Sequence, residues 1–303
     1  MQVQLILIFV ALLWGLNPSA MKVGLLSVEP MSYNFIRMIL AGVLSWLVAR
    51  KMVTFKSLRH CGYKEIMIAS GGFFLFQIFF TTGVKLTTVG NASLILSCLP
   101  ISVAVINYLH KFEQANVNLG YSIICSLVGV IIMIFSTGQS FSLESNHLIG
   151  GIMLLLAQFC YAYYTVFSKQ SIKEYSPYQV TTYILLISTI LLLPFSFNDF
   201  YQTNWSNLPW EAWASIFYSG IFPLFLGNIL WIWGAGVIGS NKASLYNNLP
   251  PVFSVMLGCL FFDEKFGWLN LLGVSLILAD YLLVKKIAII LNNIKKLTCK
   301  LTK

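Results

Sequence analysis

The sequence predicts an all-α membrane protein with ten transmembrane helices, arranged as two inverted five-helix repeats. The first reason is composition: hydrophobic residues make up 58% of the chain, charged residues 10%, and the mean hydropathy is +0.80. Soluble domains carry roughly a quarter charged residues, so lipid must solvate this chain. The second reason is a set of ten apolar runs, and the third is that the second half of the chain repeats the first.

Each predicted span is long enough to cross the hydrocarbon core, which takes about 20 apolar residues in a helix. The ten runs lie at about residues 3–23, 31–50, 64–84, 88–110, 116–136, 148–169, 178–197, 211–234, 238–262 and 267–285. Short connections that mostly carry turn or charged residues separate them. We therefore expect one five-helix repeat over residues 1–137, a second over residues 148–286, and a basic tail over residues 287–303.

Two offsets relate the halves of the chain. An offset of 147 places Trp14 on Tyr161 and Pro30 on Pro177. An offset of 151 aligns identical residues: Gly83 with Gly234, Ala92 with Ala243, Ser93 with Ser244, Leu94 with Leu245, Pro100 with Pro251, Leu109 with Leu260, and Glu113 with Glu264. Such duplication in an apolar chain is typical of transporters built from repeated helical bundles.

The loop charges predict the orientation. With the amino terminus in the cytoplasm, fifteen of the 19 basic residues lie on the cytoplasmic side, and only Lys22, Lys85 and Lys265 lie outside. Because each repeat has an odd number of spans, the second must enter the membrane upside down. The net charge of +9 therefore reflects topology and not a nucleic-acid partner. We expect a multi-pass protein of a bacterial cytoplasmic (inner) membrane, with both termini in the cytoplasm.

The two ends of the chain favour a retained first span and an interfacial tail. The first twenty residues lack the basic start of a signal peptide, and residues 11–30 align with the start of the second repeat. In the tail, apolar residues recur at helical spacing from Ile287 to Leu301, with lysines between them. This pattern favours an amphipathic helix on the anionic inner leaflet, and a disordered basic tail is the alternative.

The repeated alanine–serine step, proline and glutamate resemble the EamA family of the drug/metabolite transporter superfamily. The opening WGLNPSAMK and the spacing of Pro30 and Arg37 add to the resemblance, which covers about residues 5–285. It implies ten helices, both termini inside, a central cavity between the halves, and export or uptake of small metabolites by alternating access. It does not imply one substrate. Asp280 stands where the family often has glycine.

Arg37 has two interpretations. It lies about 10 Å along its helix from Pro30, inside the second span, where a charge must face the interior or reach a headgroup. Its planar fork suits a substrate carboxylate or phosphate. Alternatively, it ties helix-end carbonyls together or reaches toward the outer surface.

Amides and aromatic rings are the other candidates for substrate binding. Gln77 and Asn228 are equivalent at the offset of 151, so we expect them to face each other across the repeat axis. Hydrogen bonding between helices is the alternative role for such amides. The remaining candidates for the cavity wall are Trp14, Asn17, Gln158, Tyr161, Trp231, Tyr246 and Asn247.

Asp280 is the only acid away from the ends of a predicted span, so it is a candidate for proton coupling. Pairing with Lys285 or Lys286 is its alternative role. Pro100 and Pro251 are candidate hinges, because a proline inside a helix frees a backbone carbonyl, but an inherited kink explains them as well. The six cysteines are scattered without metal spacing, so the sequence predicts no metal site and no cofactor.

These features favour a secondary transporter over a membrane enzyme. His60, His110 and His147 lie at loops or span ends, and the chain has no nucleotide-binding loop. The residues indicate an amino-acid or related metabolite exporter, and a broad exporter of lipophilic drugs or toxic compounds is the runner-up. We expect a small-molecule substrate and membrane lipids as partners and no nucleic acid. Protons as the coupling ion and a monomeric assembly stay open.

Overall fold

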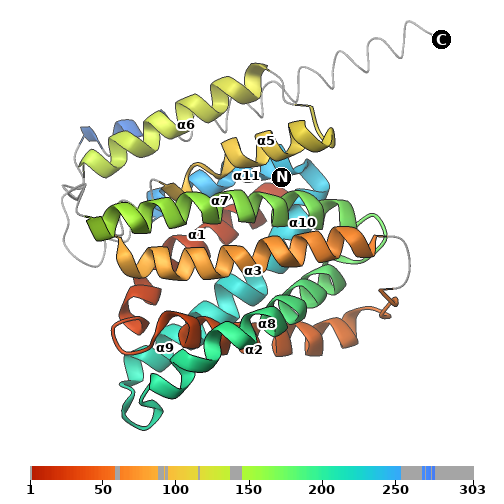
Figure 1. Ribbon diagram of the computed structural model, residues 1–303. Helices are drawn as coiled ribbons and strands as arrows, with labels where there is room; N and C mark the ends of the chain where they lie inside the picture. Colours follow the sequence, from red (N-terminus) through yellow and green to blue (C-terminus); the bar gives the residue numbers. More distant parts are fainter. Residues whose placement is uncertain are drawn as a thin grey trace, which may run out of the picture.

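Helices form all the regular structure in the described part of the chain (Figure 1). The structure, a computed structural model, describes residues 2–58, 62–87, 92, 95–114, 117–136, 145–253, 268–269, 271–273 and 275–276. The long helices are α1 (Gln2–Gly24), α2 (Pro30–Met52), α3 (Tyr63–Leu86), α6 (Val117–Ser136), α7 (Ser145–Ser171) and α8 (Pro177–Gln202). The shorter ones are α5 (Leu99–His110), η1 (Trp205–Asn207), α9 (Trp210–Ser219), η2 (Gly220–Gly227), α10 (Asn228–Ile238), α11 (Ser240–Leu245) and η3 (Tyr246–Asn248).

Among the described residues, six helical stretches are long and apolar enough to span a membrane. They are Gln2–Gly24, Pro30–Met52, Tyr63–Leu86, Leu148–Ser171, Pro177–Gln202 and Trp210–Ile238. The prediction of ten helices is therefore not confirmed. The run 88–110 is broken at a turn over Ser97 and Cys98, and runs 238–262 and 267–285 extend beyond the described residues.

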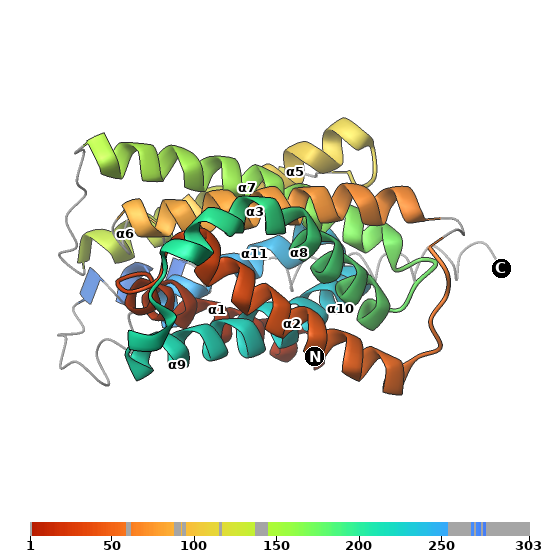
Figure 2. The same cartoon turned by 60° about the horizontal axis from the view of Figure 1, so that its bottom comes forward.

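Helices α2 and α8 show how the two repeats are related. They occupy equivalent places, since Pro30 begins one and Pro177 begins the other. They pack together at the front of the view in Figure 2. Their directions are opposed: the Ser45 hydroxyl lies 2.7 Å from that of Thr182, and Gly42 approaches Leu186. Equivalent helices that run antiparallel require a twofold axis across the bundle, so the second repeat is turned over relative to the first.

A close contact between a glycine and a leucine of neighbouring helices occurs twice, once with the glycine in each repeat. A Cβ at Gly83 would lie 2.8 Å from Leu154 Cγ, and a Cβ at Gly234 would lie 2.6 Å from Leu7 Cδ2. Gly234 follows Gly83 by 151 positions and Leu154 follows Leu7 by 147. The contact between α3 and α7 is therefore made again between α10 and α1. Glycine allows this approach because it has no side chain to separate the helices.

One helix departs from the symmetry. Trp210–Ile238 is continuous, but its middle part, η2, is a π-helix that contains Pro223. Its equivalent, α3, has Gly72 at the matching position and is α-helical throughout. A proline lacks the backbone N–H and crowds the preceding turn, so a locally wider helix accommodates it. This segment was not predicted from the sequence.

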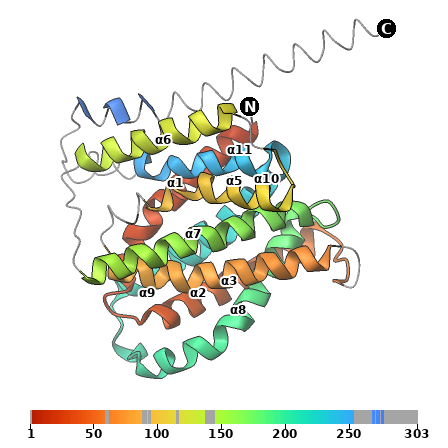
Figure 3. The ribbon, with the colours of Figure 1, turned by 45° about the horizontal axis from the view of Figure 1, so that its top comes forward.

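Both candidate hinge prolines lie at the start of a helix and not in its middle. Pro100 is the second residue of α5, after the turn at Ser97 and Cys98. Pro251 follows η3 and the bend at Leu249, within the helical residues 250–253. Neither proline therefore frees a carbonyl inside a continuous helix, because proline fits the first turn, where the N–H has no partner. The interruption itself recurs in both repeats, and α5 packs against α11 beside α6 (Figure 3).

Candidate functional site

A cavity of about 760 Å³, its entrance included, lies between the two repeats. Eight of the ten substrate-site candidates line it: Trp14, Asn17, Arg37, Gln77, Gln158, Tyr161, Asn228 and Asn247. Pro251 lines it too. The sequence interpretation missed nine further wall residues: Gly15, Pro18, Phe73, Phe76, Phe80, Leu96, Pro223, Leu224 and Pro250. The phenylalanines recur at helical spacing on α3, but a ring facing lipid gives the same pattern.

The repeat axis passes through this cavity. Trp14 and Tyr161, equivalent at the offset of 147, make an edge-to-face contact with ring centroids 5.9 Å apart. Asn247 Nδ2 donates a 2.7 Å hydrogen bond to the carbonyl oxygen of Leu96, its equivalent at the offset of 151. Two equivalent residues touch only where they lie beside the symmetry axis. Both repeats therefore contribute equivalent residues to the cavity wall.

Two predicted wall residues do not line the cavity. Trp231 packs behind Trp14, with ring centroids 4.9 Å apart, and its Nε1 donates to Thr165 Oγ1 at 3.3 Å. Tyr246 is buried in η3. The sequence suggested both as wall residues, and neither is among the described residues that line this cavity. Asp280 and the tail 287–303 lie outside the described residues.

Arg37 is buried, and neutral acceptors satisfy all five of its N–H donors. Nε donates to Asn34 Oδ1 at 2.9 Å. Nη1 donates to Ser219 Oγ at 2.8 Å and to Met21 Sδ at 3.1 Å. Nη2 donates to Gln77 Oε1 at 2.7 Å and to Thr81 Oγ1 at 3.2 Å. No carboxylate of the described residues takes part, so the cavity wall carries an uncompensated positive charge.

The equivalent amides Gln77 and Asn228 both line the cavity, but their bonding differs. The side-chain oxygen of Gln77 faces Arg37, and its Nε2 has no hydrogen-bond partner within the described protein. In contrast, Asn228 donates to the carbonyl of Leu224 at 2.8 Å and accepts from Tyr164 Oη at 3.1 Å. The two repeats therefore place amides at equivalent positions of the cavity wall, and these amides differ in their hydrogen bonds.

Two more wall atoms are buried without a hydrogen-bond partner among the described residues. They are Gln158 Oε1 and Tyr161 Oη, and the side chains that carry them are 2% and 5% exposed. Buried polar atoms are normally satisfied, because an unmade hydrogen bond costs free energy. With Gln77 Nε2 included, three buried polar atoms of residues that line the cavity have no hydrogen-bond partner among the described residues.

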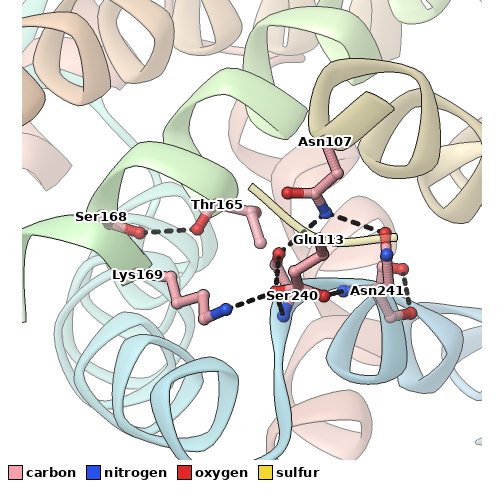
Figure 4. A network of polar contacts seen from close by, with 8 residues as sticks. Asn107, Glu113, Thr165, Ser168, Lys169, Ser240 and Asn241 are labelled. Atoms are coloured by element: carbon pink, nitrogen blue, oxygen red, sulfur yellow. Dashed lines mark hydrogen bonds and ion pairs between the residues drawn. The ribbon is translucent and has the colours of Figure 1, made fainter. Parts of the chain in front are cut away.

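A polar cluster joins the repeats at the face where α1 begins (Figure 4). We call it the Glu113 cluster, and it comprises Asn107, Glu113, Lys169, Ser240 and Asn241. Glu113 pairs with Lys169 and accepts from the backbone N–H groups of Ser240 and Asn241 at 2.8 and 3.1 Å. Asn107 Nδ2 donates to Ser240 Oγ and Asn241 Oδ1. The carboxylate thus caps the start of α11 and holds α7 beside it.

The Glu113 cluster lies beyond the cavity along α7. Lys169 is eight residues past Tyr161, which is about 12 Å of helix. Gly239, with φ of 91°, turns the chain into α11 directly above the carboxylate, where a Cβ would lie 3.2 Å from Glu113 Oε2. The sequence interpretation noted Glu113 only as a repeat residue. A further signal was present, because Lys169 follows Lys22 by the repeat offset of 147.

Lys22 makes a different contact near the opposite face. Its Nζ donates to the carbonyl oxygen of Thr87, just after α3 ends. Glu264, the repeat equivalent of Glu113, lies outside the described residues. Among the described residues, therefore, a carboxylate–lysine pair between the repeats is seen at the face where α1 begins.

The pKa of the Glu113 carboxyl is lowered from its ordinary value of 4.5. Burial alone raises this pKa, since it penalises the charged form. The hydrogen bonds from Lys169, Ser240 and Asn241 favour the carboxylate and outweigh the effect of burial. Glu113 is therefore ionised at neutral pH, and its bonds to α7 and α11 are those of a charged acceptor.

Family comparison decides the class of protein. The model of the EamA-like transporter family matches residues 2–135 and 148–285, once for each repeat. The chain belongs to the EamA-like transporter family. It is thus a multi-pass membrane transporter of the EamA and drug/metabolite type, as the resemblance implied. No group of three metal-ligating side chains occurs in the part of this transporter that the structure describes.

Curated relatives agree with this membership, and a solved structure shares the fold. The uncharacterized transporter YoaV of Bacillus subtilis is 26% identical over 91% of this chain and 94% of its own length. An uncharacterized transporter of Archaeoglobus fulgidus is 23% identical over 89% and 92%. A crystal structure described only as that of a protein superposes with a TM-score of 0.76 at 17% identity, covering 96% of this chain and 98% of the other. That similarity concerns the fold alone.

Proposed function

We propose that this EamA-type transporter is a secondary transporter that exports an amino acid or a related small metabolite by alternating access. The observation that carries the proposal is the cavity on the repeat axis, with amides, aromatic rings and one guanidinium in its wall. Repeat-built transporters bind solutes at such an interface and expose it to each side in turn. The aromatic rings suit an apolar side chain, and the free amide atoms suit a polar group.

The Glu113 cluster supports alternating access. It bonds the first repeat to the second at the face where α1 begins, whereas Asn17 and Phe80 extend the cavity toward the other face. In the proposed cycle the cluster breaks when the face where α1 begins, the proposed cytoplasmic face, opens. A proton is the coupling ion to test first, with Asp280 as the candidate carrier.

Transport by the full chain in proteoliposomes tests this function. We expect saturable, stereoselective movement of at least one zwitterionic amino acid from a panel of amino acids and nucleosides. Saturable transport of lipophilic compounds with no movement of the amino acids would favour the runner-up, a broad exporter. Failure of every panel member to move would contradict the proposal. An imposed pH gradient, applied to the wild-type protein and to Asp280→Asn, tests the proton.

A further inference from the structure

We propose that Gln77, Gln158 and Tyr161 form a head-group site that selects solutes carrying both a carboxylate and an ammonium group. This inference rests on the proposed function, and it assigns the roles of individual atoms within the cavity. Gln77 Nε2 and Tyr161 Oη donate to the carboxylate, and Gln158 Oε1 accepts from the ammonium. These are the three wall atoms that are buried without a partner in the described protein.

The two glutamines lie at the same height on neighbouring helices. Helices α3 and α7 run antiparallel, because Gly72 meets the backbone of Cys160 and Tyr164 while Gly83 meets Leu154. Gln77 lies midway between these two glycines, so it is level with Gln158. The ring centroids of Phe76, which precedes Gln77, and Tyr161 are 4.6 Å apart, so α3 and α7 are also in contact at this level. A single small head group can therefore reach both amides.

Arg37 fixes the orientation of the Gln77 amide. Its Nη2 donates to Gln77 Oε1 at 2.7 Å, which only the oxygen of the amide can accept. The amide nitrogen must then point away from the guanidinium, and both of its hydrogens are free. Arg37 is thus a positioning residue for Gln77, and it also brings a positive charge near the proposed carboxylate position.

The charge of the wall explains which solutes are rejected. No acidic side chain is among the described residues that line the cavity, and Arg37 contributes one positive charge. A simple amine would be repelled by the positive charge of Arg37, and it would find only one free acceptor, Gln158 Oε1. A simple carboxylate would leave Gln158 Oε1 without a donor. A zwitterion satisfies all three atoms, and its apolar part then lies against Trp14, Phe76 and Phe80.

Matched probes separate these cases. L-leucine carries both groups, 4-methylpentanoate lacks the ammonium, and 3-methylbutylamine lacks the carboxylate, but all three share one apolar skeleton. Binding to the purified full chain in lipid nanodiscs is measured by calorimetry. We expect the wild type to bind L-leucine most tightly, 4-methylpentanoate about tenfold more weakly, and the amine least.

Single substitutions assign each atom. Gln77→Leu should weaken L-leucine and 4-methylpentanoate alike by about tenfold, since both use the carboxylate site. Gln158→Leu should weaken L-leucine alone and so abolish its advantage over 4-methylpentanoate. Gln158→Glu should gain binding of 3-methylbutylamine. For Gln77→Leu the readout is the affinity of the two carboxylate probes relative to that of the amine on the same variant. For the Gln158 variants it is the affinity of L-leucine or of the amine relative to that of 4-methylpentanoate. A loss of folded protein does not change these ratios.

Gln170→Leu is the matched control, because it removes an amide from the same helix α7 outside the cavity. It should leave the order of the three probes unchanged. The inference is overturned if the wild type binds the amine as tightly as L-leucine, if it binds none of the probes, or if the cavity variants shift all three equally. Transport of amino acids that persists unchanged in Gln77→Leu and Gln158→Leu would overturn the head-group site and leave the proposed function standing.

Discussion

A single buried arginine shows how this protein places a full charge inside the membrane. Arg37 has no carboxylate partner among the described residues, but five neutral acceptors surround its fork, two from its own helix or α1 and three from α3 and α9. Hydrogen bonds to a charged group contribute about 1.5–3 kcal/mol each when they are made and cost free energy when broken. The geometry favours the tie between helices over direct binding of a substrate carboxylate.

We expect Arg37→Lys to lower the free energy of unfolding by at least about 2 kcal/mol, because an ammonium offers three donors and cannot reproduce the fork. Folded protein and transport should therefore fall together. Thermal stability in detergent and uptake per folded molecule measure the two quantities. Arg50→Lys, at an exposed position over the ring of Trp46, is the control. A stable Arg37→Lys protein without transport would instead indicate direct substrate binding.

The sequence predicted which helices contribute residues to the cavity wall, but not the orientation or the hydrogen-bond partners of single side chains. Gln77 and Asn228 could be placed on the wall because the repeat offset relates them, and an amide in hydrocarbon must face protein. The position of Trp231 could not be derived, since ring size does not indicate which face of the largely apolar helix α10 meets the cavity. Nor could the partners of Arg37 be derived, because they come from four helices that meet only in the folded bundle.

At the scale of elements, the helices approach each other through repeated glycine contacts. A Cβ added at Gly83 would overlap the side chain of Leu154, and a Cβ added at Gly234 would overlap the side chain of Leu7. Both neighbours must move if a methyl group is added. Overpacking of this kind typically costs about 1–3 kcal/mol.

Gly83→Ala and Gly234→Ala should therefore each destabilise the protein by about 1–3 kcal/mol, and by similar amounts because the two contacts are equivalent. Gly71→Ala is the control, since a Cβ at Gly71 would have no heavy atom within 4 Å. Thermal unfolding of the three variants in one detergent provides the comparison. Equal stability of all three would show that the two glycines do not set the helix spacing.

The Glu113 cluster makes the stability of one face depend on pH. A carboxyl whose pKa is lowered by folding stabilises the folded state above its ordinary pKa, and this contribution disappears as the pH falls through the lowered value. For Glu113 the loss therefore begins near pH 4.5 and grows below it. Other carboxyl groups titrate in the same range, so a comparison with a variant is needed.

We expect Glu113→Gln to lower the melting temperature at pH 7, because the ion pair with Lys169 is lost and an uncharged oxygen replaces the carboxylate. The difference from the wild type should shrink as the pH falls below 4.5. Melting temperatures of both proteins from pH 7 to pH 3.5 measure this. A difference that stays constant over the whole range would show that the charge of Glu113 contributes no stability.

For the whole molecule, the antiparallel pair α2 and α8 establishes that the second repeat is turned over, but geometry alone does not say which face is cytoplasmic. The loop charges predict that direction, because the ten-span topology expected from the sequence places fifteen basic residues on one side and three on the other. The sequence thus predicted both the duplication and its inversion. It did not predict the π-helix η2 or the break before Pro100, since these depend on how single prolines are accommodated.

Reporter fusions at Lys303 and beside Ser145 test the orientation. We expect a cytoplasmic signal at Lys303 and an external signal beside Ser145, where α7 begins. The physical reason is the retention of lysine and arginine on the cytoplasmic side. An external signal at Lys303 would reverse the assignment of the Glu113 cluster to the cytoplasmic face.

The hydrogen bond from Asn247 to Leu96 has a consequence for the resting state of the transporter. In an inverted repeat, exchanging the conformations of the two halves converts one access state into the other, so an exactly symmetric chain would populate both equally. Leu96 has no amide to return the bond, and Ile184 stands where a second Arg37 would be. Each unmatched bond favours one access state, and about 1.4 kcal/mol makes a tenfold preference. The cavity of the unloaded protein should therefore open mostly to one side of the membrane, and the unmatched bonds beside the repeat axis determine which side.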